Sequence, residues 1–123
     1  MKRRCFVGLT LTAGLQWTTA GYAAPPKTVQ AEVDALLASI ETSGCAFYRN
    51  GTLHDSKDAA AHLRDKYDYF AARGLIVTTE DFIERAATKS SLSGQPYEVT
   101  CGDGAAVSSK QWLRDKLAQL RAS

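Results

Sequence analysis

The sequence SGCAFYRNGTLH, residues 43–54, constrains the fold more than any other part of this chain. Asn50-Gly51 is the dipeptide that best fits a two-residue turn between antiparallel strands, because both residue types tolerate positive φ angles. The residues on either side of it, 45–49 and 52–54, are therefore predicted to be the two short strands of a hairpin. Cys45 stands at the start of the first strand.

Residues on both sides of the hairpin have the apolar spacing of helices. One stripe covers residues 28–41, and three more cover 55–73, 78–87 and 108–120. In each stripe the apolar side chains recur three and four positions apart, which places them on one face of a helix. They are Val29, Val33, Leu36, Leu37 and Ile40, then Leu63, Tyr67, Phe70 and Ala71, then Phe82, Ile83, Ala86 and Ala87, and finally Trp112, Leu113, Leu117 and Leu120.

Local signals mark the ends of these helices. Asp55 or Ser56 can cap the start of the second helix, and Gly74 ends it. Residues 78–81, Thr-Thr-Glu-Asp, predict the start of the third helix, with a hydroxyl cap and acidic residues in the first turn. Residues 108–111 have the S-x-x-Q pattern of a capping box, which predicts the start of the last helix.

A third extended run, residues 97–101, follows Pro96 and ends at Cys101. Four helices and about three short strands, joined by short turns, define an α+β fold in which helices pack on a small antiparallel sheet. Both cysteines lie at the edge of an extended run. A disulfide between Cys45 and Cys101 would therefore tie the third strand to the hairpin.

The first 23 residues have the features of a signal peptide in the required order. Lys2, Arg3 and Arg4 precede a mostly apolar run over residues 6–17, and small residues lead to predicted cleavage after Ala23, or after Ala24. The apolar run is too short to cross a bilayer, so no membrane span is expected. The paired arginines leave twin-arginine export open beside the ordinary secretory route. The expected mature protein is one exported domain, residues 24–123.

The cysteines support export. Cys5 would leave with the leader, and Cys45 and Cys101 would remain as a pair. Oxidising compartments favour a disulfide, and two cysteines allow one intramolecular bond. That bond closes a loop of about 55 residues, for which chain entropy predicts roughly 4 kcal/mol of stabilisation. The alternative is a redox or nucleophilic cysteine, but the chain has no C-x-x-C motif and no histidine near either cysteine.

The charge of the chain argues against a nucleic-acid partner. The sequence holds 15 Lys and Arg against 13 Asp and Glu, a net charge of +2. Three of the basic residues belong to the leader, so 12 basic and 13 acidic residues give the mature chain a charge of −1. Proteins that bind nucleic acid by neutralising phosphates carry an excess of basic residues. The composition, 45% hydrophobic and 23% charged, is that of a compact globular protein.

Several separated motifs of this chain form a recognisable set: SGCxFxRNG at 43–51, HLxxKY at 62–67, TExFI at 79–83 and ATKSSxSGxPYxVxC at 87–101. They resemble the YfeK-like family of small exported proteins from Gram-negative bacteria, and the likeness continues through Trp112-Leu113. Two separated blocks each carry one of the cysteines. The resemblance implies a periplasmic location and a shared fold, and it supplies no catalytic residue.

A basic cluster is the strongest candidate site. Arg49 beside a rigid turn can grip a carboxylate or phosphate with two hydrogen bonds, and the alternative is a salt bridge to a neighbouring helix. If Lys66 and Lys89 lie close to it, the three form a positive pocket walled by Tyr67 or Tyr97. The second helix supports this with a polar, basic face opposite its apolar stripe, although such faces are usually only solvated. That face consists of His62, Lys66, Tyr69 and Arg73.

Catalysis by the loop at residues 88–94 is the alternative. Ser90 and Ser91 follow Lys89, and a serine nucleophile would need that lysine to be desolvated. The chain has no S-x-x-K or G-x-S-x-G motif, and such hydroxyls commonly cap backbone groups where a helix ends. The acids at 80, 81 and 84 are placed for the helix dipole more than for glycoside cleavage.

A metal site is not expected. His54 and His62 have no ligand spacing with each other or with a cysteine. Asp58, one helical turn before His62, is the expected partner of that histidine, as Asp68 is of Arg64.

The sequence therefore predicts a small periplasmic protein without a cofactor, and a non-catalytic binding module more than an enzyme. It would recognise an anionic group of an envelope component or partner protein through Arg49, Lys66, Tyr67 and Lys89, with Ser90 and Ser91. The alternative is a small envelope hydrolase that uses the Ser90/Ser91 loop.

Overall fold

The computed structural model describes residues 23–123, so the predicted signal peptide lies outside the described residues apart from its last position. The predicted α+β class is confirmed, with four helices and four strands where about three were expected. None of the described helices has the length and hydropathy needed to cross a membrane. In chain order the elements are α1 (Lys27–Thr42), β1 (Ala46–Arg49), β2 (Thr52–His54), α2 (Ser56–Ala71), α3 (Thr79–Ala86), β3 (Glu98–Thr100), β4 (Val107–Ser108) and α4 (Ser109–Ala122).

The hairpin forms as predicted. Asn50 and Gly51 adopt φ angles of 51° and 80°, the left-handed values that a tight two-residue turn requires. The turn fixes the register of β1 and β2, in which Arg49 faces Thr52 and Phe47 faces His54. Arg49 is therefore the last residue of β1, a strand that is paired with another strand on each side.

The sheet is antiparallel throughout, with the strand order β2-β1-β3-β4. The cysteines form the predicted disulfide, which joins the residue before β1 to the residue after β3. Strand β4 was not predicted, because Val107-Ser108 is too short for a visible alternation and runs directly into α4. Ser108 both ends this strand and caps α4, since its hydroxyl accepts from the amide of Gln111.

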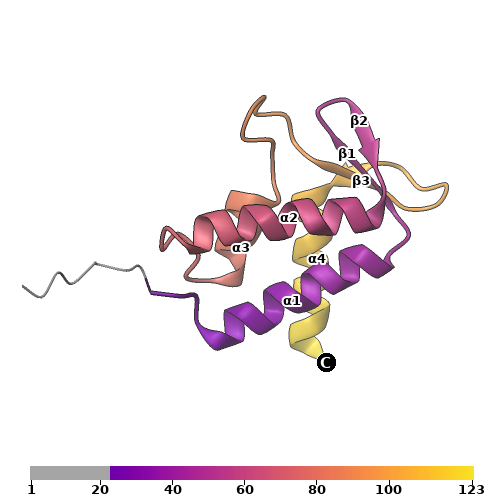
Figure 1. The fold of residues 1–123 in the computed structure, drawn as a ribbon. Coiled ribbons are helices and arrows are strands. Elements are labelled where there is room, and N and C mark those ends of the chain that lie inside the picture. The colour runs from indigo at the N-terminus through magenta and orange to yellow at the C-terminus, as the bar shows by residue number, and fades with distance from the viewer. Residues whose placement is uncertain (1–22) are drawn as a thin grey trace, which may run out of the picture.

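The core lies between the helices and one face of the sheet. Figure 1 shows α1 and α2 side by side, with α4 crossing behind them and the sheet at one end of the helical layer. Alternation along the strands sends Phe47 and Val99 inward, while Tyr48 and Glu98 face solvent. The most deeply buried helical side chains belong to the predicted stripes: Val33, Leu36, Ile40, Phe82, Ile83 and Leu113.

Two predicted side-chain pairings are wrong. Arg64 pairs with Asp34 of α1 at 2.6 Å and not with Asp68 of its own helix, because tertiary packing brings α1 beside α2, which spacing within one helix does not show. Gln111 donates to Asp115, one turn further along its own helix, and does not return to the amide of Ser108.

Candidate functional site

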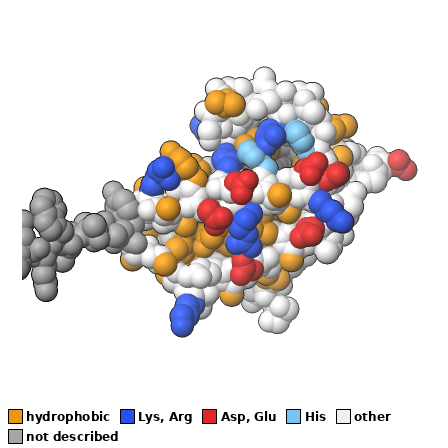
Figure 2. Space-filling model, in the orientation of Figure 1, with side chains coloured by type: hydrophobic (Ala, Val, Ile, Leu, Met, Phe, Trp, Pro, Cys, Tyr) orange, Lys and Arg blue, Asp and Glu red, His pale blue; other side chains and the backbone are white. Residues whose placement is uncertain are grey.

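Two adjoining pockets open between α2, the hairpin and the loop at residues 88–96. The first, here called the hairpin pocket, has a volume of about 330 Å³ and is lined by Phe47, Tyr48, Arg49, His54, Asp58, Ala59, His62, Leu63, Asp65, Tyr97 and Ser109. The second, the loop pocket, has a volume of about 750 Å³ and is lined by Arg49, Asn50, His62, Asp65, Lys66, Tyr69, Phe70, Ser90, Ser91, Leu92 and Tyr97. The pockets share four residues, so they form one groove. Figure 2 shows the two histidine side chains and neighbouring basic groups gathered at the hollow in this face.

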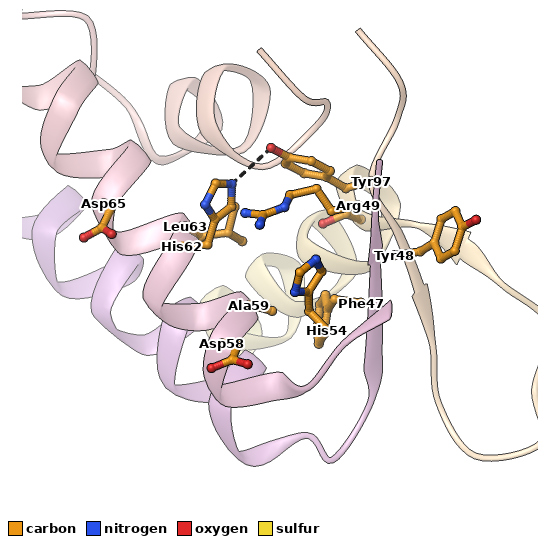
Figure 3. A pocket seen from close by; sticks show the side chains of 11 residues that line it. Phe47, Tyr48, Arg49, His54, Asp58, Ala59, His62, Leu63, Asp65 and Tyr97 are labelled. Carbon is orange, nitrogen blue, oxygen red and sulfur yellow. Dashed lines mark hydrogen bonds between the residues drawn. The ribbon is translucent and has the colours of Figure 1, made fainter. Parts of the chain in front are cut away.

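Arg49 stands where the two pockets meet. In Figure 3 its side chain extends from β1 toward α2, with the guanidinium between the imidazoles of His54 and His62. Within residues 23–123 Arg49 makes no salt bridge and no side-chain hydrogen bond. The salt bridge to a neighbouring helix that the sequence left open is therefore not formed.

Lys66 and Tyr97 form the second part of the site. The ammonium of Lys66 donates to the Tyr97 hydroxyl at 3.1 Å and to the backbone carbonyl of Lys89 at 3.0 Å, and it lies 5.0 Å from the centre of the Tyr97 ring. Burial and the charge of Arg49 lower the pKa of Lys66, and burial raises the pKa of Tyr97. An ammonium group has three donors, so one donor of Lys66 stays available for a ligand.

His62 is held by Tyr97 and not by Asp58, which corrects the expectation from the sequence. Its Nε2 lies 3.3 Å from the Tyr97 hydroxyl (Figure 3). Burial, followed by the charges of Arg49 and Lys66, lowers the pKa of His62 to about 4. The imidazole is therefore neutral at pH 7, which leaves Arg49 and Lys66 as the two positive charges of the loop pocket, where a negative charge would relieve their repulsion.

The loop at residues 88–96 closes one side of the loop pocket. The buried Ser90 hydroxyl accepts from the amides of Leu92 and Ser93 at 3.2 and 3.3 Å, as expected for a hydroxyl that stabilises a turn. The Ser93 hydroxyl donates to the side chain of Asn50 and so fastens this loop to the hairpin turn. No basic or acidic side chain of the described residues is hydrogen-bonded to Ser90 or Ser91.

The structure brings together four of the six predicted ligand-binding residues. Arg49, Lys66, Ser90 and Ser91 line the loop pocket. Tyr67 does not, because it lies on the core side of α2 and its ring packs edge-on against Phe82 at 5.7 Å. Lys89 contributes only its backbone carbonyl, while its side chain is exposed to solvent.

The sequence did not single out three further residues as pocket-lining: His54, His62 and Ser109. The polar face of α2 contained a signal for His62, which shares that face with Lys66 and Tyr69. Tyr97 was one of two tyrosines considered as a wall, and the structure places it there. In the described part of the chain no three His, Cys, Asp or Glu side chains are grouped as ligands for a metal ion.

The depressed pKa of His62 predicts how stability depends on pH. The unfolded chain takes up a proton at His62 near pH 6.5, and the folded chain does so only near pH 4. The free energy of unfolding should therefore fall as the pH decreases from 6.5 to 4, by about 1–2 kcal/mol once solvent screening is allowed for. Urea unfolding of the wild type and of His62→Gln across this range measures the difference, which should shrink in the variant. If the free energy of unfolding depends on pH equally in both proteins, the lowered pKa of His62 is contradicted.

The fold and the groove define the class: a disulfide-crosslinked α+β domain with a basic groove beside its hairpin. The chain belongs to the family described as "Family of unknown function (DUF5329)", whose model matches residues 27–121. It is also 36% identical over 69 residues to the uncharacterised protein YfeK of Salmonella typhimurium, which confirms the resemblance seen in the sequence. That alignment covers 55% of this chain and 56% of the relative, so the match spans about half the length of each. No solved structure is significantly similar.

Proposed function

We propose that this protein is a non-catalytic binding module of the periplasm that recognises an anionic group of a cell-envelope component or partner protein. The anion would sit in the groove between Arg49 and Lys66. One observation carries the proposal. Both cations are half-buried, line one pocket and make no ion pair with any carboxylate of residues 23–123.

The chemistry of the groove supports an anion more than a cation. A half-buried charge without a partner is unfavourable, and a bound carboxylate or phosphate would supply the missing partner. Asp65 also lines both pockets, but it makes no ion pair with Arg49 or Lys66. The other partly buried basic side chains that line no part of the groove each have a contact of their own: Arg64 with Asp34, Lys110 with Glu84 and Lys116 with the ring of Trp112.

The geometry of the serine loop favours binding over hydrolysis. A serine nucleophile needs a base within hydrogen-bond reach, and the Ser90 hydroxyl instead accepts two amides of its own loop. The exposed side chain of Lys89 is not desolvated. These contacts agree with the alternative interpretation of the serine hydroxyls, in which they cap backbone groups and do not catalyse a reaction.

The periplasmic location is supported by three features of the chain. The leader has the order of a signal peptide, the two mature cysteines form a disulfide, and the motifs of the chain resemble the YfeK-like family, a resemblance that implies this location. We also propose that the mature protein, residues 24–123, is a single domain, and the one core that α1 to α4 share with the sheet supports this.

The proposal predicts that inorganic phosphate and acetate bind the groove of the mature protein. In an NMR titration at constant ionic strength with chloride as balance, both anions should shift the amides of β1 and the ring signals of His62. Arg49→Gln and Lys66→Gln should each weaken binding about tenfold, the cost of losing one charge-assisted hydrogen bond.

Lys116→Gln is the matched control for Lys66→Gln. Lys116 is also half-buried and lies 5.2 Å from an aromatic ring centre, but it lines neither pocket. Its loss should leave the affinity unchanged. If neither anion shifts these signals, or if the Lys116 variant weakens binding as much as the Lys66 variant, the groove is not an anion site.

A further inference from the structure

The hairpin pocket contains polar groups that the anion site does not use. Ser109 is 1% exposed, and its hydroxyl has no hydrogen-bond partner among residues 23–123. The amide of the same residue donates to the carbonyl of Tyr97 at 2.9 Å, which fixes Ser109 beside one of the four residues that both pockets share. A buried hydroxyl without a hydrogen-bond partner is unfavourable, so a ligand that forms a hydrogen bond with Ser109 would be favoured in this pocket.

The surroundings of Ser109 combine apolar and polar groups. Phe47, Ala59 and Leu63 are buried residues of the core that also line this pocket. His54 lines it as well and makes no side-chain hydrogen bond among the described residues. The guanidinium of Arg49 reaches between the two imidazoles at the junction with the anion site (Figure 3).

We infer that the ligand of the groove is an acidic sugar: a carboxylate or phosphate attached to a small polyhydroxylated ring. The inference rests on the proposed anion site and adds the group that occupies the hairpin pocket. A sugar ring carries hydroxyls around its edge, which would pair with Ser109 and His54, and it presents C–H faces to the apolar wall. A purely apolar acid would leave Ser109 unpaired.

The volume of the hairpin pocket and the positions of its polar side chains fit this ligand. The hairpin pocket, at about 330 Å³, falls at the small end of the range of ligand sites, which suits a single ring. Arg49 belongs to both pockets, so an acidic group on that residue leaves the attached ring beside Ser109 and His54. The carboxylates Asp58 and Asp65 also line this pocket and can accept hydrogen bonds from ring hydroxyls.

A comparison of five small molecules tests the inference. Glucuronate and glucose 6-phosphate are titrated into the mature protein beside acetate, inorganic phosphate and glucose, with calorimetry and NMR as readouts. We expect at least one sugar acid to bind about tenfold more tightly than its bare anion, and glucose to bind more weakly than either. Preference for glucuronate would identify the carboxylate as the recognised group, and preference for glucose 6-phosphate the phosphate.

The variant Ser109→Ala separates the sugar from the anion. It should reduce the advantage of the sugar acid over the bare anion about fivefold and leave the affinity for the bare anion unchanged. Ser39→Ala is the control, since the Ser39 hydroxyl bonds to its own helix at Ala35 and lines neither pocket. Because the Ser109 hydroxyl bonds to no other group of residues 23–123, its removal breaks no hydrogen bond among them and should not lower the urea midpoint of unfolding.

The outcomes distinguish the inference from the proposed function. If acetate or phosphate binds and neither sugar acid binds more tightly, the acidic sugar is wrong and the anion site stands. If no anion and no sugar acid binds, both are wrong. An unchanged preference for the sugar acid in Ser109→Ala overturns the role of the hairpin pocket.

Discussion

Removal of the disulfide in a Cys45→Ala/Cys101→Ala variant is expected to lower the free energy of unfolding by about 4 kcal/mol. The two residues are separated by 56 positions, and closing so long a loop removes much of the entropy of the unfolded chain. Urea unfolding of the mature protein, followed by circular dichroism, measures the loss. For a small domain this is a large share of the total stability, so the variant should unfold at a much lower urea concentration.

Reduction of the wild type provides the control for this variant. Wild-type protein in the presence of a reductant should unfold at about the same urea concentration as the variant, and the variant itself should not respond to reductant. Intact-mass measurement of protein taken from the periplasm should show residues 24–123 with two hydrogens fewer than the reduced chain. Free thiols in that material, or a loss below about 1 kcal/mol in the variant, would contradict a structural disulfide in an oxidising compartment.

The disulfide matters for the groove as well as for stability. It joins the two strands that carry the central residues of the site: β1 ends at Arg49, and Tyr97 directly precedes β3. In the sheet β1 pairs with β3 from Ala46 to Tyr48, so the relative position of these two side chains depends on a short ladder. A covalent bond at the far end of that ladder limits how far the strands can separate.

Features that depend on neighbours in the sequence could be predicted. The turn at Asn50-Gly51 follows from two residues that accept positive φ angles, and the structure has both of them there. The stripes of α1 and α3 follow from apolar spacing, and the cap of α3 from a hydroxyl at Thr78. Each of these signals is complete within a few residues.

Features that depend on packing between distant segments could not be predicted. Tyr97 reaches Lys66 and His62 because the pairing of β3 with β1 brings the residue before β3 beside the middle of α2. Lys89 turns its side chain away because its backbone is fixed by pairing with Pro96. The burial of Ser109 results from the docking of α4, which the capping motif at its start does not specify.

Substitutions of Tyr67 and Tyr97 are expected to have opposite effects on stability and on phosphate affinity. This tests the structure, which places Tyr67 in the core and Tyr97 in the groove. Tyr67 is 6% exposed and packs on Phe82, so Tyr67→Ala should lower the free energy of unfolding by about 3 kcal/mol through the cavity it leaves. Its affinity for phosphate should stay within about twofold of the wild type, because the ring faces the core and not the groove. The milder Tyr67→Leu keeps this comparison possible if the alanine variant is too unstable.

Tyr97→Phe should have the reverse effect. The substitution keeps the buried ring and removes the hydroxyl that accepts a hydrogen bond from Lys66 and contacts His62. The free energy of unfolding should therefore change by less than about 1 kcal/mol. Phosphate affinity should fall about fivefold, because Lys66 loses the hydroxyl that orients it toward the anion. Urea unfolding and the NMR titration measure both quantities on each variant. If the folded Tyr67→Leu variant loses as much affinity as Tyr97→Phe, then Tyr67 contributes to the anion site and the structure's assignment of the two tyrosines is wrong.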